Sequence, residues 1–283
     1  MLPQAVSDHY RTQQRLIVST LALVRREWAR MGEDFDASWR EVGPRVALLT
    51  SSAQLGSARN GAAYVPATLT ELGAAADAEA RVNLRGFAGV ASDGRPIESL
   101  LYGAVVNART ASASSLPERL KVGGAWLDMA VHTQVADAGR GAASAAIAAT
   151  PRTGYARMVN PPCCARCAVL AGRTYLFNDG FLRHPRCDCV HVPIPLAGKL
   201  AKATDYVEQP SLDQITGLSK GDRKALADGA DFNRLVNVQQ RREGMRPKAQ
   251  RTRATKLTPD DIYRLAHDRE DALRLLKRNG YLL

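Results

Sequence analysis

The first part of the chain carries hydrophobic residues at helical spacing. They recur every three or four positions and form one apolar stripe: Ile17, Leu21, Val24, Trp28 and Met31. This pattern predicts an α-helix from about residue 7 to residue 31 with one buried face. A stripe of this kind favours a hydrophobic core or a protein–protein surface over a cofactor site.

Further helices are predicted as far as residue 150. Periodicity and helix-start residues place them at about 36–42, 44–63, 66–83, 96–108 and 116–147. Pro44 and Pro96 suit the first turn of a helix, where a missing N–H costs nothing, and Asp36 suits a helix start. Ala, Gly and Ser dominate residues 138–150. We therefore expect a helical domain over residues 1–150.

The pattern changes after residue 150. Alternating hydrophobic and polar residues predict strands at about 155–159, 173–177 and 188–194, separated by turns that contain Pro or Gly. The predicted fold class is mainly α: a multi-module helical protein with a small β-rich knob at residues 151–197.

Three segments follow the knob. Residues 198–238 are predicted to be a helical segment, residues 239–256 a basic linker, and residues 257–283 a C-terminal two-helix module. Thr258 and Asp268 are the predicted caps of the last two helices. Their shared apolar face favours docking on another protein.

Charge is concentrated in two of these segments. The formal net charge is +11, and residues 151–197 together with 239–256 supply ten of the eleven excess positive charges. The basic residues of the linker are Arg241, Arg242, Arg246, Lys248, Arg251, Arg253 and Lys256. Beside DNA or an acidic protein, such a segment binds anionic groups, and it lacks aromatic residues for base stacking. Without such a partner it is a solvated linker.

No membrane segment is predicted. The apolar run at residues 16–24 is too short to cross a bilayer and is flanked by Arg15 and Arg25. We expect the protein in the cytoplasm or in a particle assembled there.

All five cysteines fall within a 27-residue stretch that also contains a histidine, and a second histidine lies two residues after its end. The sequence order is Cys163, Cys164, Cys167, His184, Cys187, Cys189 and His191. Two ligand-rich clusters separated by a hairpin-length spacer are typical of a zinc site. An odd number of cysteines in a tenth of the chain disfavours a disulfide framework, although disulfides or inert thiols remain the alternative.

Tetrahedral zinc takes four ligands. Cys164 and Cys167 are the firmest pair, because a two-residue spacer allows a tight turn whose amides point at the sulfurs. The second pair is predicted to be His184 and Cys187. Cys189 is a close alternative, since side chains two apart in a strand point the same way. With no open position the zinc would be structural and would hold the knob together.

Two residues of the stretch are expected to stand apart from the metal. Cys163 should face away from the other thiols, and His191 should be a surface or packed imidazole within an alternating strand pattern. A role for His191 as a partner of a metal ligand is the alternative.

These motifs carry a resemblance to a known family. The Cys164-x2-Cys167 motif and the His184-Pro185-x-Cys187-x-Cys189 motif, at this separation, resemble the Mu F-like minor head proteins of tailed bacteriophages. Residues 217–233 and 257–281 are similar to the version found in phages of actinobacteria. The resemblance covers residues 150–283 by motif and the first 150 residues in general character. The extra Cys163 departs from the family pattern.

The resemblance implies a structural minor capsid protein that aids head morphogenesis. Such a protein is present in few copies inside the phage head, in contact with the portal or the major capsid protein. It would aid head assembly or genome packaging and delivery, with packaged DNA as a partner for non-specific phosphate contacts. The implied location is the virion, assembled in the host cytoplasm.

Some relatives are labelled capsid maturation proteases, which is the first alternative function. Gly217-Leu218-Ser219-Lys220-Gly221 matches the nucleophile-elbow pattern. The residues before it are polar and short, so we predict that Ser219 caps a helix from Lys220 to Asp228, with Asp222 in the capping box.

The second alternative is a zinc-containing nucleic-acid-binding protein or nuclease. A nuclease would need a His-Asn-His-like set beside the cysteines, and only His184 and His191 lie there. No catalytic residue is assigned on these grounds.

Overall fold

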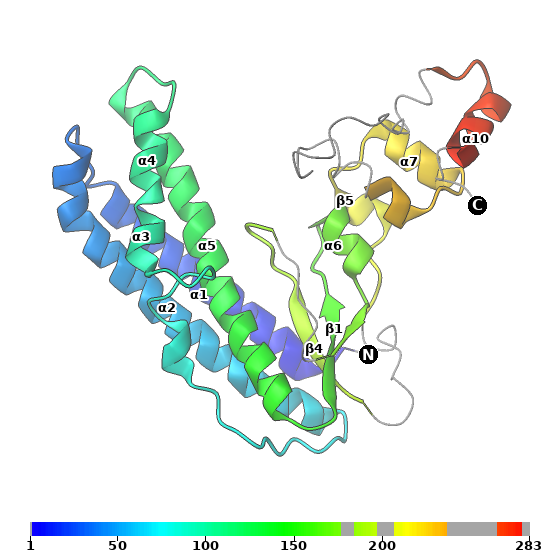
Figure 1. The fold of residues 1–283 in the computed structure, drawn as a ribbon, viewed down its shortest axis with the longest axis horizontal. Helices are drawn as coiled ribbons and strands as arrows, with labels where there is room; N and C mark the ends of the chain where they lie inside the picture. The colour runs from blue at the N-terminus through cyan, green and yellow to red at the C-terminus, as the bar shows by residue number, and fades with distance from the viewer. Residues whose placement is uncertain (1, 177–183, 197–206, 237–264, 279–283) are drawn as a thin grey trace. The chain divides into compact units, whose positions relative to one another are not determined.

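The computed structural model describes residues 2–176, 184–196, 207–236 and 265–278 (Figure 1). It is mainly helical with a small sheet, as the sequence predicts. The chain divides into two compact units, one of Met1–Met158 with Gly172–Glu208 and one of Val159–Ala171 with Gln209–Leu283. None of the helices in the described ranges is long and apolar enough to span a bilayer.

The first unit is built on three long helices that pack together (Figure 1). They are α1 (Gln4–Trp28), α2 (Phe35–Glu71) and α5 (Leu116–Ala149). The predicted stripe on α1 faces the core, where Ile17, Val24 and Trp28 are buried. Met31 is buried just beyond the end of the helix. The buried face that the apolar periodicity of α1 predicts is therefore confirmed.

Helix α2 corrects the predicted boundaries at Pro44 and Pro66. Both prolines lie inside one continuous helix, which is capped by Asp34 and not by Asp36. An interior proline removes one hydrogen bond and crowds the preceding turn. Buried residues on either side, such as Val42 and Val46 around Pro44, hold the helix in register.

The end of α2 also falls earlier than predicted. The helix ends at Glu71, and Gly73 adopts a positive φ of 68°. The amide of Ala74 donates to the carbonyl of Leu69 at 2.9 Å, which is the hydrogen bond of a glycine-terminated helix end. Residues 74–83 are consequently not helical.

Shorter helices complete the helical part of this unit. The helix predicted at residues 96–108 is divided at Tyr102 into α3 (Ile97–Leu101) and α4 (Gly103–Thr110). A 3-10 turn, η1 (Leu84–Phe87), precedes them. The main core is formed where α1, α2, α3, α4 and α5 meet, around residues such as Leu101, Val105 and Val131.

A three-stranded antiparallel sheet belongs to the same unit. Strand β1 (Thr153–Met158) lies between β3 (Thr174–Tyr175) and β4 (Val190–Pro195). In the register, Ala156 pairs with Val192, and Tyr155 pairs with Tyr175. All six residues of β1 are buried. The sheet shares a second core with the ends of α2 and α5.

The second unit contains short elements. Strand β2 (Cys163–Cys164) pairs in parallel with β5 (Ile215–Thr216). The helical elements are α6 (Ala165–Leu170), the 3-10 turn η3 (Leu212–Gln214), α7 (Lys220–Ala227) and α10 (Arg269–Arg278). The basic linker at 239–256 and the helix predicted after Thr258 lie outside the described residues.

Candidate metal centre

The first pair of predicted ligands sits at the start of α6. Cys164 is the N-cap of this helix, and its Sγ accepts a hydrogen bond from the amide of Cys167 at 3.4 Å. A spacing of three residues at the start of a helix brings the two side chains to the same side. The expected tight turn, with an amide pointing at a sulfur, is confirmed.

The second set of ligands lies on a turn that leads into β4. The amide of Cys187 donates to the carbonyl of His184 at 3.0 Å, and Arg186 adopts a positive φ of 60°. The amide of Arg186 also donates to Thr133 Oγ1 of α5 at 3.0 Å. This turn reverses the chain and places Cys187 and Cys189 where both are buried.

The imidazole of His184 is oriented by its neighbour. Its Nδ1 lies 2.8 Å from the carbonyl oxygen of Pro185. A proton on Nδ1 that is donated to this carbonyl places the ring lone pair that can bind a metal on Nε2. Histidines that bind metals are commonly held in this way, with the other ring nitrogen bonded to a carbonyl.

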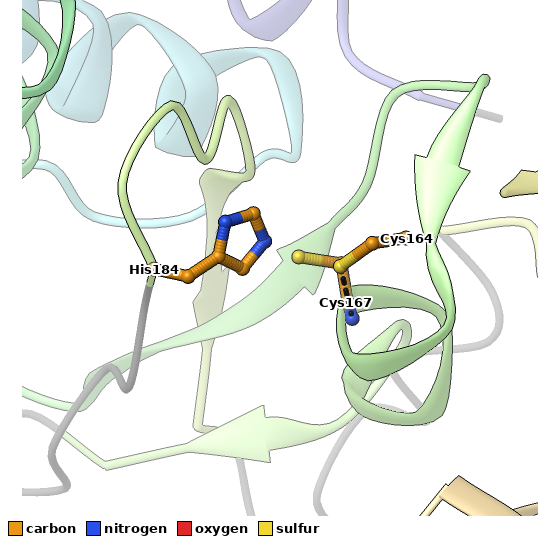
Figure 2. Close-up of side chains that lie close together, drawn as sticks. All are labelled: Cys164, Cys167 and His184. Atoms are coloured by element: carbon orange, nitrogen blue, oxygen red, sulfur yellow. Dashed lines mark hydrogen bonds between the residues drawn. The ribbon is translucent and has the colours of Figure 1, made fainter. Parts of the chain in front are cut away.

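These side chains come together as two overlapping groups. The ligand atoms of Cys164, Cys167 and His184 lie within 4.8 Å of one another, and so do those of Cys167, Cys187 and Cys189. Figure 2 shows the His184 ring directed toward the sulfurs of Cys164 and Cys167. Cys167 belongs to both groups, so the five residues form one cluster that can hold a metal ion.

The chemistry of this cluster suits a metal. All five cysteines are unlinked by disulfides, so the sulfurs are available as ligands. Thiolate and imidazole are the ligands of structural zinc, and burial of Cys167, Cys187 and Cys189 shields the cluster from water.

The sulfurs of the second set lie against a buried cation. Arg157 of β1 is 1% exposed, and its Nη2 lies 3.5 Å from Cys189 Sγ and 3.8 Å from Cys187 Sγ. A buried guanidinium needs negative partners. Thiolate ligands of a metal carry the charge that offsets it.

The two remaining residues of the motif stand apart, as expected. Cys163 is buried in β2 opposite Ile215 and belongs to neither ligand group. His191 is buried in β4, with its ring 4.3 Å from that of Tyr155 and its Nδ1 3.5 Å from Ser144 Oγ. His191 is therefore a packed imidazole.

Asp188, between the two cysteines, points to a different partner. The hydroxyl of Tyr10 donates to Asp188 Oδ2 at 3.0 Å. Burial raises the pKa of Asp188 above its ordinary value, and the pKa of Tyr10 is raised by burial and by the neighbouring carboxyl group. This contact fixes the turn to α1 and leaves the two cysteines on either side of it for the cluster.

One residue that contacts this turn is not predicted from the sequence. Arg140 of α5 donates from Nε to the carbonyl of Cys189 at 2.9 Å and from Nη2 to the carbonyl of Cys187. Its signal in the sequence is slight: it is the single charged residue in the run of small residues at 138–150. A charge in such a run has to find a buried partner.

Comparisons with known proteins give no assignment. No family model matches the chain, and no curated protein or solved structure matches it either.

Proposed function

We propose that this protein is a structural protein whose Cys/His cluster binds one zinc ion. The observation that carries the proposal is the convergence of five sulfur and imidazole ligands in two groups that share Cys167. Zinc favours tetrahedral sites of thiolate and imidazole, whereas magnesium and calcium favour oxygen ligands. A site filled by protein ligands leaves no position for a reacting water, so the role of the ion is to stabilise the fold.

The ligand set we propose is Cys164, Cys167, His184 and Cys187. Cys164 with Cys167, and His184 with its Nδ1 held by Pro185, supply three ligands from one group. Cys187 supplies the fourth from the other group, and Cys189 is the alternative in that position. Both cysteines lie beside Arg157, so either one brings its charge to the same place.

The biological setting we propose is the head of a tailed bacteriophage. The residues that resemble the Mu F-like minor head proteins are the same residues that converge in the cluster. This supports a minor head protein inside the capsid, in contact with the portal or the major capsid protein, that aids head assembly or genome delivery. The basic linker supports non-specific contacts with packaged DNA.

Metal analysis of the purified protein tests the zinc site. We expect about one zinc per chain by mass spectrometry, with loss of the ion and of stability in Cys164→Ser and in Cys187→Ser. Cys163→Ser is the matched control, because this neighbouring cysteine belongs to neither ligand group. A metal-free protein with five titratable thiols would disprove the proposal.

Cobalt substitution tests the ligand set. Cobalt(II) bound by thiolates gives charge-transfer and ligand-field absorption whose energies depend on the number of sulfurs. We expect His184→Ala to change this spectrum and lower the affinity, while Cys189→Ser leaves the spectrum intact. The reverse result would assign Cys189 as the fourth ligand and remove His184.

Analysis of virions tests the setting. Antibodies against this protein should detect a few copies in purified DNA-filled heads of the phage that encodes it. A nonsense mutation in its gene should yield defective or empty heads under electron microscopy. Normal, infectious heads without the protein would refute a role in head morphogenesis and leave the metal site standing.

A further inference from the structure

The backbone of the turn at Cys187 and Cys189 is bound by a buried ion pair of α5. Arg140 donates to the carbonyls of both cysteines, and its Nη1 lies 2.6 Å from Asp137 Oδ1. The side chains of Arg140 and Asp137 are only 8% and 7% exposed. The backbone of this turn is therefore bound by a charged group that is itself buried and paired.

The geometry of the contact explains why arginine stands there. Cys187 and Cys189 are two residues apart, so in extended backbone their carbonyls point to one side and their side chains share another. A planar guanidinium presents several N–H groups in a rigid fork. Its Nε and Nη2 bind the two carbonyls, and Nη1 binds Asp137. The fork thereby fixes the spacing of the two sulfurs.

Asp137 is itself held in place by the loop before α3. The hydroxyl of Ser92 donates to Asp137 Oδ2 at 2.6 Å, so the two carboxylate oxygens bind Ser92 and Arg140 separately. The amide of Ser92 donates to Gln134 Oε1, one turn earlier on α5, at 2.8 Å. A continuous chain of hydrogen bonds thus runs from Ser92 through Asp137 and Arg140 to the turn.

Two arginines contact the same turn, one at its backbone carbonyls and the other at its sulfur atoms. Arg140 binds the carbonyls of Cys187 and Cys189, whereas Arg157 lies against their sulfurs. The positive charge of Arg157 lies beside the sulfurs and would offset the negative charge of thiolate ligands. The hydrogen bonds of Arg140 go to these two carbonyls and to Asp137, so it acts on the metal through the position of the backbone.

We propose that Arg140 is a positioning residue for the metal centre and couples metal binding to the folding of α5. The inference rests on the proposed zinc site. With the turn held by Arg140, the sulfurs are already arranged before the ion binds, and less ordering is required on binding. By linkage, the ion stabilises the helix that holds the turn.

The test is the zinc affinity of Arg140 variants, measured by competition with a chromophoric chelator. We expect Arg140→Met to lose roughly 10- to 100-fold in affinity, as is common for residues that orient metal ligands. Arg140→Lys should recover only a small part, since lysine keeps the charge and loses the fork. The cobalt(II) spectrum of folded Arg140→Met should also shift, which a loss of stability alone would not cause.

Arg119→Met is the matched control on the same helix. Its Nε donates to the carbonyl of Ala108 at 3.2 Å and its guanidinium stacks on Phe35, so it also binds a backbone carbonyl from α5 but has no link to the turn. This variant should lower stability and keep the zinc affinity within about twofold of the unsubstituted protein.

Ser92→Ala is a second test variant, to be used if Arg140→Met does not fold. It removes only the outer link of the chain and should weaken zinc binding a few-fold. Unchanged affinity and an unchanged cobalt(II) spectrum in Ser92→Ala and in folded Arg140→Lys would overturn the inference while leaving the zinc site intact. Failure of the unsubstituted protein to bind zinc would instead overturn the proposed function itself.

Discussion

At the scale of single residues, several buried polar groups in this protein have dedicated partners. Arg157 lies against two sulfurs, Arg140 binds two carbonyls and Asp137, and the hydroxyl of Tyr64 donates to the carbonyl of His191 at 2.7 Å. Each of these groups would be costly to bury alone. Substitutions at such positions should therefore have large effects, and those at helix caps moderate ones.

Ser219 illustrates the moderate case and also tests the protease alternative. Its hydroxyl accepts from the amide of Asp222 at 3.0 Å, and Asp222 Oδ2 accepts from the amide of Ser219 at 3.0 Å. This is the predicted capping box.

We expect Ser219→Ala to cost about 1 kcal/mol and to speed hydrogen exchange at the Asp222 amide, whereas Ser219→Asp preserves the cap. Chemical unfolding and exchange measured on the whole chain check this. If both variants abolished processing of head proteins, Ser219 would be a nucleophile, because aspartate replaces the cap and not the attacking oxygen.

His9 gives a pH-dependent stability. Its ring is buried in α1 and stacks on Tyr64 with 3.9 Å between ring centroids. Burial lowers the pKa of His9 from 6.5 to about 4. The folded protein thus holds the neutral ring, while the unfolded chain binds a proton below pH 6.5.

Stability from His9 is therefore fully present above pH 6.5 and is lost as the pH falls toward 4. The loss should amount to roughly 3 kcal/mol. Denaturant unfolding at a series of pH values should show this loss in the unsubstituted protein and not in His9→Phe, which keeps a stacked ring. The unsubstituted protein and His9→Phe have the same metal ligands, so a loss of stability caused by acid release of the metal is equal in both and does not affect the difference between them. Parallel pH profiles would contradict the assignment.

At the scale of elements, the first unit depends on a close approach of α2 and α5. Gly61 of α2 faces the backbone of Gly139 on α5, and a Cβ at Gly61 would collide with the carbonyl oxygen of Gly139. A Cβ at Gly139 would lie 2.6 Å from Ser57 Oγ. Small residues at this crossing let the helices approach, and Arg140 follows directly on α5.

Gly61→Ala should destabilise the protein by about 1–3 kcal/mol, because the added methyl group meets rigid backbone. Gly56→Ala on the same helix is the control. Its Cβ would lie 3.4 Å from the nearest atom of Leu16, an ordinary contact, and alanine gains up to about 1 kcal/mol in helix propensity. Thermal unfolding of both variants checks the difference. Equal stability would show that the crossing adjusts without cost.

At the scale of the whole molecule, charge and chemistry are separated along the chain. The metal ligands occupy residues 164–189, and the densest positive charge lies at 239–256, outside the described residues. Seven basic residues in eighteen positions with a single acidic one predict a segment that binds polyanions. The two features are therefore separately testable by substitution.

Replacement of all seven basic residues of the linker by glutamine should weaken DNA binding equally for unrelated sequences. The slope of log affinity against log salt should become shallower by about 6, since each phosphate contact contributes about 0.9. Fluorescence anisotropy with short duplexes of two sequences measures this. Replacement of the exposed arginines Arg11, Arg15 and Arg26 on α1 is the control. An unchanged slope would identify the segment as a plain linker.

Features that depend on local spacing could be predicted from the amino-acid sequence. The buried stripe of α1, the capping box of Ser219 and the tight turn of Cys164 and Cys167 follow from residues within a few positions of one another. The chemistry of the cluster was readable too, because clustered thiols and imidazoles have few other uses.

Features that depend on contacts between distant residues became visible in the folded protein alone. Helix α2 runs through Pro44 and Pro66 because burial along its length outweighs the hydrogen bond that each proline removes. Local sequence patterns report the cost of the proline and do not report the burial. The turn at Cys187 is held by Arg140, which lies 47 residues earlier in the chain. Such pairings depend on how the helices pack, and helix packing is a property of the assembled core.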